Sequence, residues 1–260
     1  MSMTQAKLPR DWKDTIISPI STEWDRQLVS NYRPVNLTCI IVNVLETIIR
    51  DQLLACVETH GLLAAEQHGF RPGRSCLTNL LLAREDWVEA RDENHLLDVV
   101  FIDLSKAFNK VSHLGLLSKL KGFGLDQCLC EWFRDCLMDR RQKVRVNGLL
   151  SGWKAVSSGV PQGTLLGPLL FLLYVDELPG ILTSSSLLFA DDIKIWKTVN
   201  NNDDRSVLHT DLDKLAEWSS LWSFEMNVRK SAVMHLDQKS YTSYSLGDTE
   251  LPDVNEQKDL

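Results

Sequence analysis

The chain has 260 residues, of which 44% are hydrophobic and 24% charged, and its net charge is −7. This composition is ordinary for one large globular domain or two small ones, and it excludes a disordered chain, a collagen and a coiled coil. The charge is uneven, because residues 1–150 hold 19 basic and 19 acidic side chains while residues 151–260 hold 9 and 16. Phosphate binding depends on Lys and Arg, so the second half predicts few contacts to a polyanion.

Cysteine and apolar patterns point to the cell interior. The six cysteines stand mostly in apolar or helical stretches, without a CxxC pair or a His pair at zinc spacing, and we interpret them as reduced core thiols. The N-terminus lacks the apolar segment of a secretory leader, and the longest apolar run, residues 165–175, is too short to span a bilayer. We therefore expect an intracellular protein, nuclear or cytoplasmic, with no membrane partner.

Helical patterns appear in several parts of the chain. Apolar side chains recur at helical spacing over residues 42–57, and Gly61 stands where the C-terminal cap of that helix is expected. A second helix is predicted to start after Ser75, a good N-cap residue, and to continue to Val88. Further helices are expected around residues 116–120, 128–137 and 206–221.

Extended patterns lie between these helices, so the predicted fold class is α+β. Residues 96–102 are nearly all apolar and rich in Val, which predicts a buried strand that ends at Asp103. Asn147-Gly148 is a typical two-residue hairpin turn. It is expected to join residues 142–146 to 149–156, and a second strand pair is expected at residues 186–190 and 193–196.

Acidic residues follow two of the predicted buried strands. Asp103 ends one strand, and Asp191-Asp192 lie at the tip between two others. Unpaired carboxylates are costly to bury, so three of them in one place require a cation, and hard oxygen ligands suit Mg²⁺. Each acid taken alone is equally explained as a turn former.

Ordered motifs show a family resemblance. The segments DLSKAFNKV (103–111), SGVPQG (158–163) and FADD (189–192) resemble, in this order, the first three palm motifs of reverse transcriptases from non-LTR (LINE-like, jockey-type) retrotransposons. NYRPVNL (31–37) and GFRPGRS (69–75) resemble finger motifs of that family, and FEMNVRKS (224–231) resembles its fourth palm motif. The resemblance extends from about Pro9 to Leu260, and six ordered motifs are jointly very specific.

The resemblance implies a right-hand polymerase fold, with fingers, a palm whose antiparallel sheet packs on helices, and no thumb. Residues 1–95 would be fingers-like, residues 96–236 the palm with the catalytic motifs, and residues 237–260 the start of the palm-to-thumb segment. The implied activity is RNA-directed DNA polymerisation, a two-metal nucleotidyl transfer from a dNTP to a primer 3′-hydroxyl. The implied partners are an RNA template, a DNA primer, dNTPs, and the endonuclease and thumb of a longer element protein.

Carried over residue by residue, the resemblance assigns Asp103, Asp191 and Asp192 as catalytic ligands of two Mg²⁺ ions, for which Mn²⁺ can substitute, with Leu104 as a further metal-binding position. It assigns nucleotide binding to Arg71, Arg74, Ala107, Phe108, Gln162 and Lys230. Phe108 would lie under the sugar and exclude a 2′-hydroxyl. Four of these positions also have a simpler interpretation: a core aromatic for Phe108, a solvated loop charge for Arg71 and Arg74, and a surface lysine for Lys230.

Some features depart from the family pattern. Asn109 stands where the first palm motif usually has Asp, and the sequence stops where a thumb would begin. A decayed or domesticated copy, which folds and binds RNA without polymerising, is therefore the alternative to an active polymerase domain. The survival of all three acids favours the polymerase. A two-metal nuclease would use the same carboxylates, but it has no use for the Pro161-Gln162-Gly163 loop.

Overall fold

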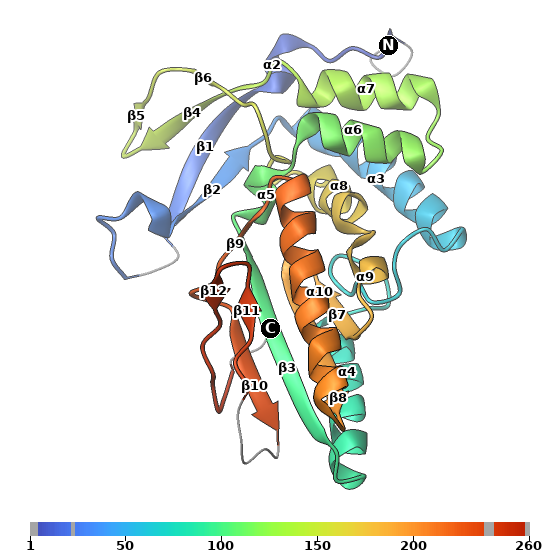
Figure 1. Ribbon diagram of the computed structural model, residues 1–260. Coiled ribbons are helices and arrows are strands. Elements are labelled where there is room, and N and C mark those ends of the chain that lie inside the picture. Colours follow the sequence, from blue (N-terminus) through green and yellow to red (C-terminus); the bar gives the residue numbers. More distant parts are fainter. Residues whose placement is uncertain (1–4, 22–23, 237–241, 258–260) are drawn as a thin grey trace. The chain divides into compact units, whose positions relative to one another are not determined.

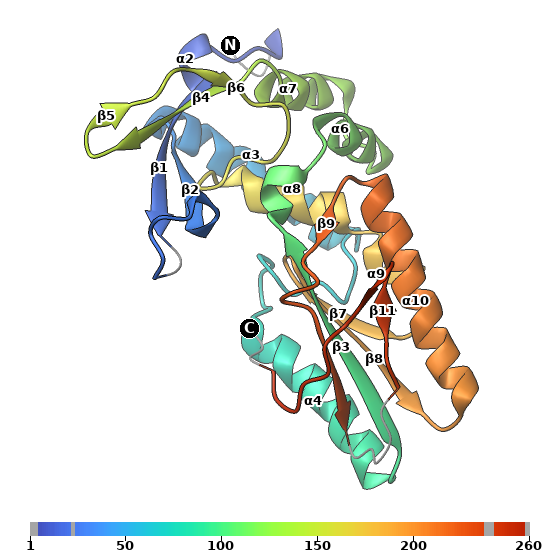
Figure 2. The ribbon, with the colours of Figure 1, turned by 60° about the vertical axis from the view of Figure 1, so that its left-hand side comes forward.

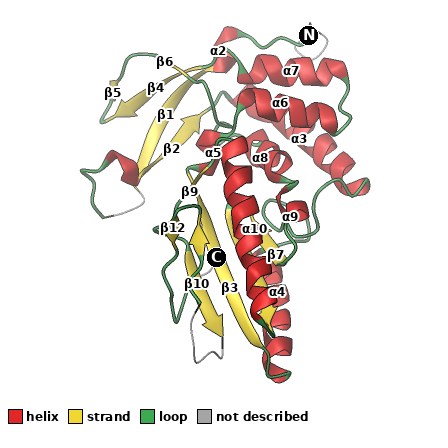
Figure 3. Ribbon diagram, viewed as in Figure 1, coloured by secondary structure: helices red, strands yellow, loops and turns green. Residues whose placement is uncertain are grey.

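The computed structural model describes residues 5–21, 24–236 and 242–257 (Figures 1 and 3). The chain divides into two compact units, Met1–Leu62 with Phe108–Tyr174 (unit 1) and Leu63–Ala107 with Val175–Leu260 (unit 2). Both contain helices and largely antiparallel strands, which confirms the α+β class. Each unit combines two segments that are separated in the sequence. The domain boundaries expected at residues 95 and 236 therefore stay predictions. Within the expected C-terminal segment, residues 237–241 and 258–260 lie outside the described residues. In the ranges that the structure describes, no helix combines the length and apolar character that a membrane crossing needs.

Unit 1 is built on a sheet made of β1 (Asp14–Ser21), β2 (Tyr32–Leu37), β4 (Arg141–Val146), β5 (Leu149–Leu150) and β6 (Lys154–Ala155). The strand order is β2-β1-β4-β5, with β6 paired to β4; β1 and β4 run parallel and the other pairs antiparallel. Asn147 and Gly148 have φ angles of 49° and 82°, the left-handed values that tight hairpin turns use. The predicted hairpin turn is therefore confirmed, whereas the returning strand expected at residues 149–156 is divided into β5 and β6.

The helices of unit 1 bury apolar faces. Its elements are α2 (Arg10–Lys13), the 3-10 turn η1 (Val29–Asn31), α3 (Ile40–Thr59), α5 (Ala107–Lys110), α6 (His113–Gly122), α7 (Gln127–Leu137) and α8 (Leu166–Val175). The predicted helices at 42–57, 116–120 and 128–137 are thus present. In α7, Trp132 and Phe133 are fully buried and their rings meet edge to face, which is a favourable aromatic geometry. The long apolar run at residues 165–175 forms the core helix α8.

Unit 2 is built on a second sheet, made of β3 (Leu96–Ser105), β7 (Ser185–Phe189), β8 (Asp192–Val199), β9 (Glu225–Met226) and β10 (Ala232–Leu236). The order is β10-β3-β8-β7, with β9 paired to β3, and every pair is antiparallel. Helices α4 (Cys76–Asp92) and α10 (Asn202–Leu221) lie on opposite sides of this sheet (Figure 2). The short helix α9 (Leu178–Ile181) and the strand pair β11 (Ser245–Leu246) and β12 (Thr249–Glu250) complete the unit.

Side-chain alternation explains these layers. On one face of the sheet, Leu97, Val99 and Trp196 pack with Ala83 and Ala90 of α4 into a buried cluster. The α4 start confirms Ser75 as N-cap, because its hydroxyl accepts a hydrogen bond from the Thr78 N–H in a capping box. α10 directs Leu208, Leu212 and Leu215 inward, all fully buried.

Two element boundaries differ from the sequence prediction, and two strands, β1 and β2, were not predicted. β3 continues beyond Asp103, since Leu104 and Ser105 gain partners in β9. α10 starts before residue 206 because the Asn201 side chain caps it by accepting from the N–H groups of the first turn. β1 and β2 have no clear alternation in their sequences, and their pairing with each other and with β4 stabilises them.

Candidate active site

The turn between β7 and β8 presents two of the predicted acids. Phe189 pairs with Asp192 across the hairpin, so Ala190 and Asp191 form its two-residue tip. Ala190 has a φ of 57°, a left-handed conformation that costs a residue other than glycine roughly 1 kcal/mol. Asp191 is half-buried and Asp192 is exposed. Strained backbone of this kind persists where neighbouring contacts hold it in place.

Asp103 lies directly beside this hairpin. Asp103 of β3 is the cross-strand partner of Asp192 in β8, so both side chains project from the same face of the sheet. Like charges placed opposite each other on neighbouring strands are destabilising. The pair therefore gains stability when a cation lies between the two carboxylates.

The fourth palm motif orients Asp103. The Asn227 amide donates to Asp103 Oδ2 at 2.9 Å, and the Asn227 backbone N–H donates to the Asp103 carbonyl at 2.8 Å. The buried Ser231 hydroxyl accepts from the Asp103 N–H at 3.3 Å. These contacts join residues that lie more than a hundred positions apart, and they restrict the rotamer of the Asp103 carboxylate.

The Ala190-Asp191 tip is also held from the side of the finger motif. Gln67 is 2% exposed, and its Oε1 accepts hydrogen bonds from the Ala190 N–H at 2.9 Å and the Gly69 N–H at 2.8 Å. Its Nε2 donates to the Ala190 carbonyl at 3.3 Å. The segment around Gln67 contacts β7 through an isolated parallel β-bridge between Gln67 and Leu188.

The finger-motif arginines hold the same segment. Arg71 is buried and donates to the carbonyls of Ala64 (2.5 Å) and Gln67 (3.3 Å), while Arg74 donates to those of Ala65 and Gln67. Burial, followed by the positive charges of Arg74, Arg71 and Lys194, lowers the pKa of His68 below its ordinary value. Both arginines thus lie in unit 2 with the acids, in a positively charged environment that suits a phosphate.

The other unit 2 positions assigned by the resemblance lie in the same strands and turns. Leu104 is buried in β3 next to Asp103 and pairs with Met226. Lys230 is exposed in the turn after Asn227, and its backbone N–H donates to the Asn227 carbonyl. Ala107 is buried at the start of α5.

The SGVPQG loop forms a separate feature within unit 1. Gln162 Nε2 donates to Asn109 Oδ1 at 3.3 Å, and the Gln162 carbonyl accepts from the backbone and side-chain N–H groups of Asn36. Gln162 Oε1 is buried without a hydrogen-bond partner among the described residues. A buried unpaired acceptor costs about 1–3 kcal/mol, so this atom is suited to receive a ligand donor.

Glycines allow the loop to approach its neighbours. Gly159 has a φ of 89°, and a Cβ there would lie 2.8 Å from the Asn109 carbonyl oxygen. Gly163 has a φ of 92° and a Cβ would lie 3.1 Å from the Asn36 oxygen. The loop borders a pocket of about 310 Å³, whose lining includes Thr15, Ile17, Asn36, Asn109, Arg140, Gln142 and Gln162.

His113 and Phe108 contact this loop: His113 through its ring, and Phe108 through its carbonyl, which accepts from the Val160 N–H at 2.8 Å. A ring nitrogen of His113 lies 2.9 Å from the Gly159 carbonyl, and burial lowers the pKa of this histidine, against a smaller raising effect of that hydrogen bond. Phe108 stacks on Phe171 with ring centroids 4.3 Å apart and an interplanar angle of 19°. Part of the Phe108 ring therefore serves packing, in agreement with its interpretation as a core aromatic.

The carboxylates fit a metal that is shared with a substrate. Mg²⁺ sites in proteins commonly use one or two carboxylates, and water and substrate phosphates complete the coordination. Asp103 and Asp192, paired across β3 and β8 with Asn227 on one oxygen, meet that requirement. Among the described residues, no three His, Cys, Asp or Glu side chains gather as a metal-binding group, so the structure pairs Asp103 with Asp192 but does not bring Asp191 into a three-carboxylate cluster with them.

Gln67, Asn227 and Ser231 support the site, yet the sequence analysis assigned them no role. Asn227 and Ser231 stand inside the segment that resembles the fourth palm motif, and their place in that motif is the signal that could have found them. Gln67 stands two residues before the GFRPGRS segment. An uncharged polar residue beside a glycine in a loop is common, so its type alone carries no signal.

The chain matches a known protein family over most of its length. Residues 22–250 match the protein family described as "Reverse transcriptase (RNA-dependent DNA polymerase)". The chain belongs to this family. Reverse transcriptases generally use divalent metal ions, in agreement with the facing carboxylates.

Relatives of this reverse transcriptase chain come from mobile elements. It is 32% identical over 237 residues to the "Probable RNA-directed DNA polymerase from transposon X-element" of Drosophila melanogaster, covering 86% of this chain and 25% of the relative. It is 28% identical to the "RNA-directed DNA polymerase from mobile element jockey" of the same fly, covering 86% and 25%. A type-1 R2 element polyprotein of Popillia japonica is 27% identical, covering 89% and 33%. The resemblance to non-LTR elements is thus confirmed, and the chain spans a quarter to a third of these relatives.

Solved telomerases share the fold. Apo telomerase from Candida tropicalis superposes with a TM-score of 0.64 at 12% identity, covering 93% of this chain and 47% of that one. Telomerase from Candida albicans, solved with a TWJ fragment of telomeric RNA, gives a TM-score of 0.61 at 12% identity, covering 94% and 46%. This likeness confirms the predicted fold of fingers and palm with an antiparallel palm sheet.

Proposed function

We propose that this chain is the fingers and palm part of an RNA-directed DNA polymerase, which extends a DNA primer on an RNA template. The observation that carries the proposal is the cross-strand pairing of Asp103, near the end of β3, with Asp192, the first residue of β8. Asp191 occupies the tip of the same hairpin. The chain spans about a quarter of the length of its X-element and jockey relatives.

In this proposal the three aspartates bind the metal ions, and neighbouring polar residues orient the aspartates. When bound, two Mg²⁺ ions activate the primer 3′-hydroxyl and neutralise charge on the triphosphate during in-line displacement. Asp103, Asp191 and Asp192 are the proposed ligands, with Leu104 as a further metal-binding position. The Asn227 amide keeps Asp103 Oδ2 in one orientation, which lowers the entropy lost when a cation is captured.

The nucleotide is recognised by the remaining assigned residues. Arg71 and Arg74 hold phosphate oxygens, since a guanidinium has five N–H donors and can contact a loop carbonyl and a phosphate together. Lys230 neutralises the leaving pyrophosphate. Gln162 contacts the nucleotide through its buried Oε1, Ala107 gives space beside the sugar, and Phe108 excludes a 2′-hydroxyl.

Primer extension tests the assignment. The substrate is poly(rA) with an oligo(dT) primer, and the reaction contains Mg²⁺ or Mn²⁺. Asp191→Asn should abolish extension, because an amide is nearly isosteric with the carboxylate but cannot neutralise a cation. Asp213→Asn, an exposed residue of α10, is the matched control and should retain activity. The chain is assayed alone and continued through a thumb.

Thermal unfolding provides a readout that does not need activity. Millimolar Mg²⁺ should raise the melting temperature of the parent chain and of Asp213→Asn, by mass action on the folded state. Asp191→Asn should show no such rise. An equal Mg²⁺ response in Asp191→Asn and the parent contradicts the metal assignment. RNA binding without extension, even with a thumb, identifies the chain as a decayed RNA-binding copy.

A further inference from the structure

We propose that Gln67 is a positioning residue for the catalytic hairpin: its amide fixes Ala190 and thereby the direction in which the backbone delivers Asp191 and Asp192. The inference rests on the proposed function, because it takes these two carboxylates as metal ligands. Gln67 itself touches neither a metal nor a substrate in this arrangement. It acts through the backbone of the turn.

Both polar atoms of the Gln67 side chain make hydrogen bonds to backbone groups. Its Oε1 accepts from the Ala190 N–H at 2.9 Å, and its Nε2 donates to the Ala190 carbonyl at 3.3 Å. The same Oε1 also accepts from the Gly69 N–H at 2.8 Å. One buried amide thus binds the donor and the acceptor of a single residue, which holds both backbone torsions of Ala190.

Ala190 is the residue at which such support matters. Its φ of 57° is left-handed, which an alanine rarely adopts without neighbouring contacts. The peptide plane that contains the Ala190 carbonyl also contains the Asp191 N–H, so the Gln67 contact orients the start of Asp191. A relaxed Ala190 would turn Asp191 and its neighbour away from Asp103.

Close packing reinforces the hydrogen bonds. A Cβ built on Gly69 would lie 2.4 Å from the Ala190 nitrogen and 3.1 Å from the Ala190 Cα. The finger-motif backbone therefore lies against the turn with no space for a side chain. A displacement on one side is transmitted directly to the other.

The platform that carries Gln67 is itself anchored. The His68 N–H donates to the Leu188 carbonyl at 2.8 Å, and the Leu188 N–H donates to the Glu66 carbonyl at 2.9 Å. Arg71 adds a hydrogen bond to the Gln67 carbonyl. This segment bridges to β7 at Leu188, and the Gln67 side chain is fixed relative to the strand that leads into the turn.

The test measures Mn²⁺ alone, by the loss of the free-ion electron paramagnetic resonance signal on titration into the full chain. Gln67→Met keeps the volume and removes the hydrogen bonds, and it should weaken Mn²⁺ binding roughly tenfold, as loss of an orienting partner does in other metal sites. Asp191→Asn should abolish the same binding. Primer extension by Gln67→Met should show a higher requirement for metal.

Asn79→Leu is the matched structural control. Asn79 is fully buried, and its Nδ2 donates at 3.1 Å to the carbonyl of Leu188, which lies two residues before Ala190. Its replacement should lower the melting temperature but leave the Mn²⁺ affinity unchanged. If Asn79→Leu weakens Mn²⁺ binding as much as Gln67→Met, the effect is one of general stability and the proposal is overturned.

The outcomes separate this inference from the proposed function. Wild-type affinity in Gln67→Met, together with loss in Asp191→Asn, overturns the positioning role and leaves the metal site in place. Binding that Asp191→Asn does not weaken overturns the metal site itself. Should Gln67→Met fail to fold, Gly69→Ala pushes on Ala190 from the same side, and wild-type Mn²⁺ affinity in that variant overturns the positioning role.

Discussion

Phe108 combines packing with the proposed selection of the sugar. Its ring stacks on Phe171, so truncation costs stability as well as selectivity. Phe108→Val should let ribonucleotides compete with dNTPs, because the discrimination is a steric clash with one hydroxyl. It should also cost roughly 2 kcal/mol of unfolding free energy, since a large, half-buried ring is replaced by a small side chain.

The measurement is the ratio of deoxyribonucleotide to ribonucleotide incorporation in an active, thumb-containing protein. Phe171→Leu is the control, because it removes the same ring stack and keeps Phe108. That variant should lose stability and retain selectivity. An unchanged ratio in Phe108→Val would make Phe108 a core residue only.

Asn109 shows how a departure from the family pattern is accommodated. Its Oδ1 accepts from Gln162 Nε2, and its backbone carbonyl accepts from the Ser158 hydroxyl at 3.0 Å. An aspartate has the same acceptor at this position. The replacement therefore leaves the contact with the SGVPQG loop intact, and no metal ligand is lost.

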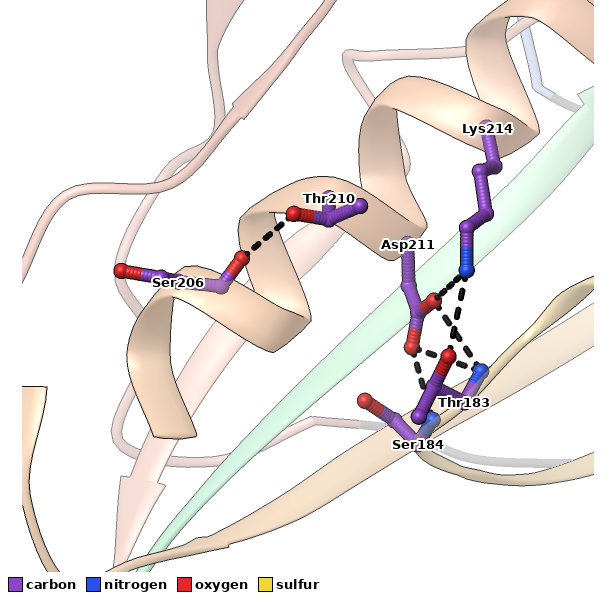
Figure 4. A network of polar contacts seen from close by, with 6 residues as sticks. All are labelled: Thr183, Ser184, Ser206, Thr210, Asp211 and Lys214. Carbon is purple, nitrogen blue, oxygen red and sulfur yellow. Dashed lines mark hydrogen bonds and ion pairs between the residues drawn. The ribbon is translucent and has the colours of Figure 1, made fainter. Parts of the chain in front are cut away.

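At the scale of elements, one buried carboxylate ties α10 to the loop before β7 (Figure 4). Asp211 is fully buried and accepts from the N–H groups of Thr183 (3.0 Å) and Ser184 (2.7 Å). Lys214 Nζ lies 3.0 Å from Asp211 Oδ1. Burial raises the pKa of Asp211, but the hydrogen bonds from Ser184, Lys214 and Thr183 outweigh it, and the pKa falls below the ordinary 3.8.

Asp211→Asn should therefore destabilise unit 2 by roughly 3 kcal/mol at neutral pH, because it removes charge-assisted hydrogen bonds from a buried site. An acid whose folded-state pKa is lowered stabilises the fold above its unfolded value near 3.8. That contribution is lost as the pH falls through the lowered folded value. The difference between parent and variant should shrink in that acid range.

Urea unfolding at pH 7 and at stepwise lower pH measures this difference. Asp213→Asn, exposed on the same helix, is the control and should change stability by no more than about 0.5 kcal/mol. A difference between parent and Asp211→Asn that stays constant down to the acid transition would contradict the argument.

At the scale of the whole molecule, the distribution of charge decides nucleic-acid affinity. Arg140 is buried and donates to the Cys136 carbonyl, so it does not lie on an open surface. The register of the unit 1 sheet instead gathers cations on the face opposite the pocket-lining residues Thr15 and Ile17. This basic face consists of Arg33, Arg141, Lys143 and Arg145.

Trp153 lies against the basic face, with Arg141 5.0 Å and Lys143 4.5 Å from its ring centroid. Arg141 is also paired with Asp14 at 2.5 Å. Each neutralised phosphate of a single strand contributes about 0.7 to the salt slope. Contacts from all members of the face therefore give a slope no steeper than about −3, and we expect micromolar or weaker binding.

Lys143→Ala with Arg145→Ala should weaken single-stranded RNA binding and reduce the slope of log K against log salt by about 1.4. The measurement is fluorescence anisotropy of a labelled RNA across a salt series. Lys121→Ala with Arg134→Ala, exposed cations of α6 and α7, is the control and should leave the slope unchanged. Nanomolar RNA binding by the parent, with a steep dependence of log K on log salt, would show that cations outside the basic face also contact phosphates.

The elements whose signals are local could be predicted from the sequence. Helix α4 carries its own N-cap at Ser75, and the Asn147-Gly148 turn accepts the left-handed angles that a tight hairpin needs. β1 and β2 could not be predicted, because they are stabilised by pairing with each other and, for β1, by pairing with the distant strand β4. The conformation of residues 165–175, which form α8, could not be predicted for a different reason: a continuous apolar run does not distinguish a helix from a strand.

The same division applies to the site. The sequence by itself determined which residues are the candidates for the chemistry, because it predicts Asp103, Asp191 and Asp192 at the ends of buried strands, where a carboxylate is costly without a cation. The tertiary structure alone decided that Asp103 faces Asp192 across two strands, that Asn227 orients it, and that Gln67 holds the Ala190 turn. These contacts depend on strand register and on packing between distant segments, and neither is encoded in the spacing of residues along the chain.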